Sequence, residues 1–167
     1  MRHWVRSVVL GAVVSAGAAV ATGIGCGDDY HSAGWSNQLD TTLANNRTAI
    51  AVGLGDLNGD GALDAAVANS QNEINVLISK RDGSFATGVA YPIDLGANSR
   101  IVLVGDVNGD GRGDVLVGND NLNTVSLFLN QGDGVLGTGQ AVQVGCRPRA
   151  MVLADMNGDN APDAVVA

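Results

Sequence analysis

Aromatic side chains are scarce in this chain of 167 residues, which holds two Trp, two Tyr and two Phe. It also has two cysteines and two histidines, and both histidines, His3 and His31, lie in the first 31 residues. Two cysteines make no disulfide framework, and we predict that Cys26 and Cys146 are not joined. Catalysis needs positioned acids, bases or nucleophiles, and the sequence contains no nucleophile elbow, paired-histidine metal site or phosphate-binding loop. We therefore expect a protein that is not an enzyme.

Basic residues are also few, since nine Lys and Arg stand against 17 Asp and Glu. Without the first 25 residues, seven basic residues would face 17 acidic ones, a net charge of −10. Such a surface repels nucleic acid and anionic lipid headgroups, so we expect no nucleic-acid partner. It attracts cations instead, and three divalent ions would bring the net charge from −10 to −4.

The chain is rich in Val, Ala and Leu, in Asn and Asp, and in glycine, of which there are 24. This mixture is typical of short strands joined by tight turns. No segment after the first 26 residues has the length and 3.6-residue period of an amphipathic helix. The composition therefore predicts an all-β fold of about one domain in size.

The N-terminal residues 1–25 read as an export signal. Arg2 and Arg6 precede an apolar run over residues 8–21, which is short and rich in small residues for a spanning helix. The run ends in Gly23-Ile24-Gly25-Cys26, which resembles a bacterial lipobox, although leucine is usual where Gly23 stands. The resemblance implies a lipidated Cys26 and attachment to a membrane. An ordinary signal peptide or an uncleaved anchor is the alternative, and either way we expect an exported protein.

One nine-residue motif occurs three times after this region. Its copies are DLNGDGALD at residues 56–64, DVNGDGRGD at 106–114 and DMNGDNAPD at 155–163. Such even spacing indicates one repeated structural unit of about 50 residues. We divide the chain into a flexible tether over residues 26–46, repeats over 47–98 and 99–148, and a partial repeat over 149–167.

Each complete repeat contains four short apolar segments. In the first they lie at 48–55, 64–69, 73–79 and 85–93, and in the second at 99–105, 114–119, 123–130 and 136–144. Asp82-Gly83 and Asp133-Gly134 are hairpin signals before the last strand of each. Four antiparallel strands per 50 residues are typical of β-propeller blades. Propellers have four to eight blades, and this chain supplies about 2.5. We therefore predict that the chain is part of a longer propeller that has been truncated, or that several copies associate to close one.

The repeated motif places oxygen-bearing side chains at positions one, three, five and nine of a tight turn. A hard cation such as calcium takes six to eight oxygen ligands from carboxylates, amides and carbonyls. Glycine at position six lets the backbone reverse, and the carbonyl at position seven can then face inward. The third loop has Asn160 at position six and is therefore expected to bind more weakly. The predicted ligands are Asp56, Asn58, Asp60, Ala62 and Asp64; Asp106, Asn108, Asp110, Arg112 and Asp114; and Asp155, Asn157, Asp159, Ala161 and Asp163.

Two alternatives exist for these loops. An EF-hand needs a glutamate at position twelve and a following helix, but that position is Val67, Val117 or Val166 and a strand is expected next. Dockerin-type loops, which also lead into a helix, are excluded for the same reason. Plain Asp/Asn/Gly turns without metal remain the other reading, in which nine clustered carboxylates would repel one another.

The loop followed by an apolar strand, an Asn-rich turn and Asp82-Gly83-Ser84-Phe85 resembles the FG-GAP, or VCBS, repeat of integrin-like propellers. The resemblance covers residues 46–167. The chain departs from the family pattern at Asn160 and at Leu136, which stands in the second repeat where the first has Phe85. It implies a β-propeller whose blades hold Ca²⁺ in these loops, through the ligands given above.

The predicted function is therefore a calcium-stabilised, lipid-anchored binding or adhesion module of the bacterial cell envelope, with a protein or glycan as its unknown ligand. Gly27 follows Cys26 where an acidic residue would favour retention, so the outer membrane is expected. A lectin-like propeller and an accessory domain of a polysaccharide-degrading enzyme are the alternatives. Scarce aromatic residues weaken the lectin reading, because few rings can stack on sugars.

Overall fold

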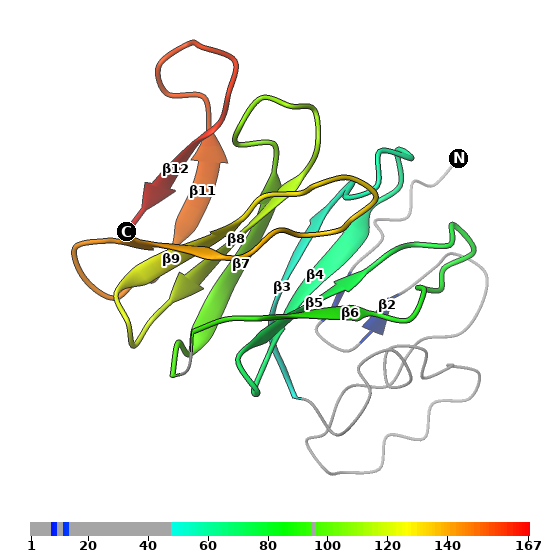
Figure 1. Ribbon diagram of the computed structural model, residues 1–167, viewed down its shortest axis with the longest axis horizontal. Helices are drawn as coiled ribbons and strands as arrows, with labels where there is room; N and C mark the ends of the chain where they lie inside the picture. Colours follow the sequence, from blue (N-terminus) through cyan, green and yellow to red (C-terminus); the bar gives the residue numbers. More distant parts are fainter. Residues whose placement is uncertain (1–7, 10–11, 14–47, 95) are drawn as a thin grey trace, which may run out of the picture.

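The computed structural model describes residues 8–9, 12–13, 48–94 and 96–167 (Figure 1). Every regular element in this part of the chain is a β-strand, which confirms the all-β prediction. These residues contain no helix long and apolar enough to cross a membrane. Cys26 and the predicted tether lie outside the described residues, and so does most of the predicted export signal.

The strands form two four-stranded antiparallel sheets and two hairpins. Blade 1 comprises β3 (Ala49–Gly55), β4 (Asp64–Asn69), β5 (Glu73–Leu77) and β6 (Val89–Pro92) in that order. Blade 2 comprises β7 (Ser99–Gly105), β8 (Asp114–Asn119), β9 (Thr124–Phe128) and β10 (Gln140–Gln143). The hairpins are β11 (Met151–Ala154) with β12 (Asp163–Val166), and β1 (Val8–Val9) with β2 (Ala12–Val13). The prediction of about 2.5 propeller blades is thus confirmed.

The fourth strand of each blade begins later than the sequence predicts. Phe85 and Leu136, the predicted first residues, make only isolated bridges to Ser79 and Asn130. Between the Ser79–Phe85 bridge and the Val76–Val89 pair, the inner strand advances three residues and the outer strand four. The same one-residue excess separates the two pairings in blade 2. An extra residue of this kind bends the outer strand and breaks its ladder, so β6 and β10 are short.

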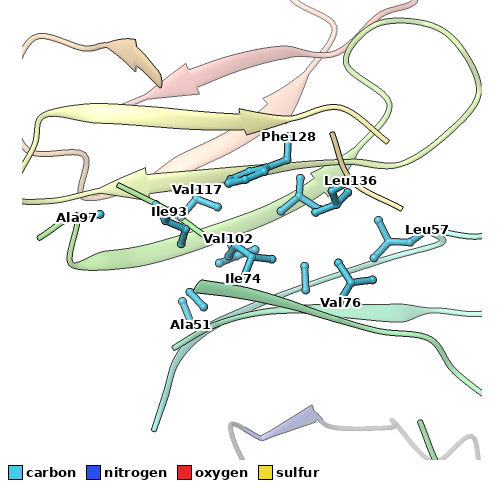
Figure 2. Packing of buried hydrophobic residues seen from close by; sticks show 13 residues of the cluster. Ala51, Leu57, Ile74, Val76, Ile93, Ala97, Val102, Val117, Phe128 and Leu136 are labelled. Carbon is cyan, nitrogen blue, oxygen red and sulfur yellow. The ribbon is translucent and has the colours of Figure 1, made fainter. Parts of the chain in front are cut away.

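The two blades pack face to face around one apolar core. Side chains alternate between the faces of a strand, so Ala66 and Ala68 of β4 point toward blade 2, while Val115 and Val117 of β8 point toward blade 1. Figure 2 shows Ile74 and Val76 of blade 1 opposite Val117 and Phe128 of blade 2. Because both faces of a central strand are covered, all six residues of β8 are buried.

Glycines on β3 allow the innermost strands of the two blades to approach closely. A Cβ added to Gly53 would lie 2.8 Å from the carbonyl oxygen of Val102, and one added to Gly55 would lie 2.8 Å from the Cβ of Val104. Both Val102 and Val104 belong to β7. The separation of the blades along their first strands therefore depends on the absence of a side chain at these positions.

The β11–β12 hairpin lies beside blade 2 as the start of a third unit (Figure 1). A Cβ on Gly105 of β7 would lie 2.6 Å from Leu153 Cδ1, which shows how closely β11 approaches. On the other face of the hairpin, the paired residues Val152 and Val165 are 53% and 42% exposed. This unit therefore has one face that blade 2 covers only in part, and the other face lies in solvent.

Candidate metal-binding loops

The three repeated loops each connect the first two strands of a unit, and all three lie at the same end of the sheets (Figure 1). They join β3 to β4, β7 to β8 and β11 to β12. The first two loops lie next to each other, because Asn130 Nδ2 donates to both the Leu57 carbonyl (2.8 Å) and the Gly113 carbonyl (2.9 Å). Strands rather than helices follow every loop, which confirms the exclusion of an EF-hand.

The aspartate at position one holds the turn together through its two carboxylate oxygens. Asp56 Oδ1 accepts the Gly59 N–H at 2.7 Å and the Asp60 N–H at 3.2 Å, and Oδ2 accepts the Gly61 N–H at 2.7 Å. Asp106 repeats all three bonds, to the N–H groups of Gly109, Asp110 and Gly111. Asp155 accepts the equivalent bonds from Gly158 and Asn160. One carboxylate thus collects the backbone N–H groups of the turn.

Positions three and five bring two more oxygen-bearing side chains to the same turn. In the first loop Asn58 Oδ1 accepts the Asp60 N–H (3.0 Å), and Asn58 Nδ2 donates to Asp60 Oδ2 (3.2 Å). The second loop repeats both contacts between Asn108 and Asp110, at 3.0 and 3.1 Å. In the third, Asn157 Oδ1 accepts the Asp159 N–H at 2.9 Å.

The N–H of the residue at position seven donates to the position-five carboxylate in each loop. The donors are Ala62, Arg112 and Ala161, at 2.7, 2.9 and 2.8 Å. Their carbonyl oxygens are the groups that the sequence nominates as ligands, and that role stays a prediction.

The aspartate at position nine ties the loop to the strands behind it, a role that the sequence did not reveal. Asp64 is fully buried; its Oδ2 accepts the Leu57 N–H and its Oδ1 accepts the Ser79 N–H, both at 2.8 Å. The equally buried Asp114 accepts the Val107 N–H at 3.1 Å and the Asn130 N–H at 2.8 Å. Asp163 in the third loop accepts the Met156 N–H at 3.0 Å.

Burial and hydrogen bonding move the pKa values of these carboxyls in opposite directions. Burial raises the pKa of Asp114, and the neighbouring Asp110 and Asp106 charges add to the rise, while the N–H donors of Asn130 and Val107 oppose it. The Ala62 N–H lowers the pKa of the exposed Asp60, as do the Asn58 side chain and the Arg81 guanidinium. The N–H groups of Gly158 and Asn160 lower the pKa of Asp155. A bound cation would favour the charged form of all three.

The residue at position six adopts a left-handed conformation in every loop. Its φ is 81° at Gly61, 83° at Gly111 and 68° at Asn160. Asn is one of the few residues with a side chain that adopts this conformation readily. The third loop therefore has the same backbone path as the others, and its weaker affinity stays a prediction.

Two arginines approach the position-five carboxylates, which the sequence did not suggest. Arg81 Nη2 lies 3.2 Å from Asp60 Oδ1, and Arg112 Nη1 lies 3.4 Å from Asp110 Oδ2. Arg81 comes from the β5–β6 turn, 21 residues further along the chain than Asp60. These guanidinium groups partly offset the loop charge and would compete with a cation for the same oxygens.

The three loops can offer a metal ion carboxylate, amide and backbone carbonyl oxygens. Among the described residues no three His, Cys, Asp or Glu side chains gather closely enough to form a metal site by themselves. A cation in these loops would therefore need other ligands in addition to the carboxylates, namely the amide oxygens of the position-three asparagines, such as Asn58, and backbone carbonyls. Such an all-oxygen set suits calcium, and a carboxylate oxygen that accepts a single N–H, as Asp56 Oδ2 does, keeps a further lone pair. The residues present thus fit Ca²⁺.

The tripeptide Arg112-Gly113-Asp114, which integrins of animals read in other proteins, is not displayed here. Asp114 has no exposed surface, and its carboxylate is occupied by two backbone N–H groups. The likeness to an adhesion tripeptide is therefore a coincidence of sequence.

The same loop architecture in three successive units is the mark of a repeat family, and the family profile of the FG-GAP-like repeat matches residues 56–117 and 106–166. The chain belongs to the FG-GAP-like repeat family. Each match begins at the first aspartate of a loop and ends in the second strand of the next unit. The resemblance inferred from the motif is thereby confirmed. No curated protein matches the chain closely enough to serve as a relative.

Proposed function

We propose that this FG-GAP-like chain is a calcium-stabilised, non-enzymatic module that binds a protein or glycan at the bacterial cell envelope. One observation carries the calcium proposal, namely the same oxygen-rich turn in three places. In each, the Asp at position one accepts backbone N–H groups of the turn, and the Asn at position three accepts the N–H of the Asp at position five. The family match supports a repeat module of the propeller type.

Calcium in this proposal is structural. The ligands at positions one, three and five lie on the turn, whereas Asp64 and Asp114 lie at the start of β4 and β8. An ion held between them would fasten the turn to the strand and offset the repulsion between carboxylates. Extracellular calcium modules bind at about 10⁻⁴–10⁻³ M. At 10 mM Ca²⁺ each such site would add about 1.4–2.7 kcal/mol to the free energy of unfolding.

The test is urea unfolding of residues 27–167 in 10 mM CaCl₂ and in EDTA. We expect calcium to raise the urea midpoint and Asp110→Ala to reduce the rise by about one site's share. Asp94→Ala removes one charge from an exposed residue outside the loops and is the matched control that keeps the full response. Equal midpoints with and without calcium in the parent protein would remove the metal from the proposal.

The envelope location rests on the N-terminal segment. We propose that Cys26 carries lipid after cleavage of residues 1–25, since Gly23-Ile24-Gly25-Cys26 resembles a lipobox. In a bacterial host, the full chain should incorporate labelled palmitate and sediment with membranes, and Cys26→Ala should abolish the label. Labelling of the Cys26→Ala variant, or none of the parent, would contradict lipidation at this residue.

A further inference from the structure

Three arginines surround one buried carboxylate at the end of blade 2 away from the metal-binding loops. Asp120 follows β8, and its side chain is 6% exposed. Arg100 Nε of β7 lies 3.3 Å from Asp120 Oδ2, while Arg149 Nη2 and Arg147 Nε lie 3.6 and 3.8 Å from Oδ1. Asn98 Nδ2 also donates to Oδ2, at 3.3 Å. We call Arg100, Arg147 and Arg149 with Asp120 the arginine cluster.

The arginine cluster has more positive charge than its carboxylate can balance. Three guanidinium groups face one anion, a local surplus of two charges, whereas residues 48–167 as a whole carry six basic and 14 acidic side chains. Half of those basic residues thus gather at this one place. The overall negative charge of the chain does not explain why these three arginines lie together, since like charges repel one another.

Most of the donor capacity of the arginine cluster faces solvent. The side chains of Arg100, Arg147 and Arg149 are 56%, 62% and 58% exposed. A guanidinium has five N–H donors in a planar fork, and each of these contacts Asp120 through a single nitrogen. Asp120 Oδ1 has no hydrogen-bond partner, because its two arginines stand 3.6 and 3.8 Å away. Asp120 therefore gathers the guanidinium groups without saturating them.

A blade does not need this cluster in order to fold. At the equivalent place in blade 1, 50 residues earlier, Ile50 stands where blade 2 has Arg100, and Ser70 stands where it has Asp120. Blade 1 nevertheless forms the same four-stranded sheet with the same irregular pairing at its first strand. The cluster is thus an addition to the repeat rather than part of its framework.

We propose that the arginine cluster binds a doubly charged oxyanion group, a phosphate monoester carried by a glycan. Two negative charges match the surplus of two, and planar guanidinium forks bind such oxyanions through paired N–H donors. The acidic remainder of the surface favours an isolated ester group over a continuous polyanion such as nucleic acid. The six residues of β8 separate the cluster from the metal-binding loops by about 20 Å. The inference deepens the proposed binding function and does not depend on calcium.

The test is a titration of the full chain in detergent micelles, followed by NMR at low salt, with glucose 6-phosphate in one arm and the singly charged glucose 6-sulfate in the other. We expect saturable shifts at the Arg100, Arg147 and Arg149 side chains with glucose 6-phosphate, weaker binding of glucose 6-sulfate, and no shifts with glucose. Equal or tighter binding of glucose 6-sulfate would contradict the match between the two charges of the ester and the surplus of two. Arg147→Gln should weaken binding about tenfold, the loss of one charge-assisted hydrogen bond, and Arg147→Lys should weaken it less because the charge remains.

Lys80→Gln is the matched control, since it removes one exposed positive charge from the other blade. If Lys80→Gln and Arg147→Gln lowered the affinity for the ester equally, the effect would come from the overall charge of the protein, and the proposal would be overturned. Absence of saturable shifts with glucose 6-phosphate would overturn it as well. Repeating the titration with Asp110→Ala in EDTA separates the two proposals, because ester binding should persist there even if no loop binds calcium.

Discussion

Replacement of Asp114 by alanine should destabilise the protein even when no metal is present. The buried carboxylate accepts the Asn130 N–H at 2.8 Å and the Val107 N–H at 3.1 Å. A buried donor left without a partner costs about 1–3 kcal/mol. We expect the full cost for the Asn130 N–H and only part of it for the Val107 N–H, which is half-buried. We therefore expect Asp114→Ala to lower the free energy of unfolding by about 2–4 kcal/mol.

Burial of the charge itself limits this loss. The raised pKa of Asp114 shows that desolvation disfavours its ionised form in the fold. The sign follows from linkage: because the folded pKa exceeds 3.8, this group's contribution to stability declines as the pH rises from 3.8 through the folded pKa. At neutral pH the two hydrogen bonds therefore have to outweigh the cost of desolvating the Asp114 carboxylate. For this reason we expect the loss of unfolding free energy to lie in the lower part of the range that the two bonds would give together.

The assay is urea unfolding in EDTA at pH 7, with Asp110→Ala as the comparison. The exposed Asp110 accepts the N–H of Arg112, and water can replace that acceptor, so its loss should change the free energy of unfolding by less than about 0.5 kcal/mol. With a urea slope of about 2 kcal/mol/M, Asp114→Ala should lower the midpoint by about 1–2 M. Midpoints that agree between the two variants would refute the structural role assigned to the ninth position.

Two further predictions concern other parts of the fold. Gly55→Ala should lower the free energy of unfolding by about 1–3 kcal/mol, because its Cβ would meet the β-branched Val104 side chain; in the same urea assay Gly145→Ala, whose Cβ meets nothing within 4 Å, should be nearly neutral. Ser84→Ala should raise the pKa of Asp82 toward 3.8, because the Ser84 hydroxyl and N–H bonds lower it; an NMR titration of the Asp82 carboxyl would contradict this if the pKa did not move.

Interactions between near neighbours in the chain are what made the loops and first strands predictable. Asp56 bonds only to N–H groups three to five residues away, so the motif alone contains the groups that shape the turn. The strands after it follow from apolar residues directly behind a turn, and β4 and β8 begin and end where the sequence predicts. A motif used three times at nearly equal spacing then implies a stack of similar sheets.

The hydrogen bonds between distant residues could not be predicted from the sequence, because no local pattern shows which distant side chain will be the partner. Asn130 donates to Leu57, 73 residues away, and the second acceptor role of Asp114 depends on the position of β9. The late start of β6 and β10 also escaped, since one extra residue in an outer strand leaves the apolar pattern almost unchanged.

The sequence by itself determined the repeat, the all-β class and the three oxygen-rich turns, because each depends on residues within about ten positions of one another. The tertiary structure decided which faces meet, that Asp64 and Asp114 are buried anchors, and that Arg100, Arg147 and Arg149 converge on Asp120. Those arginines come from two segments almost 50 residues apart. Only the stacking of β11 beside β7 brings their charges together.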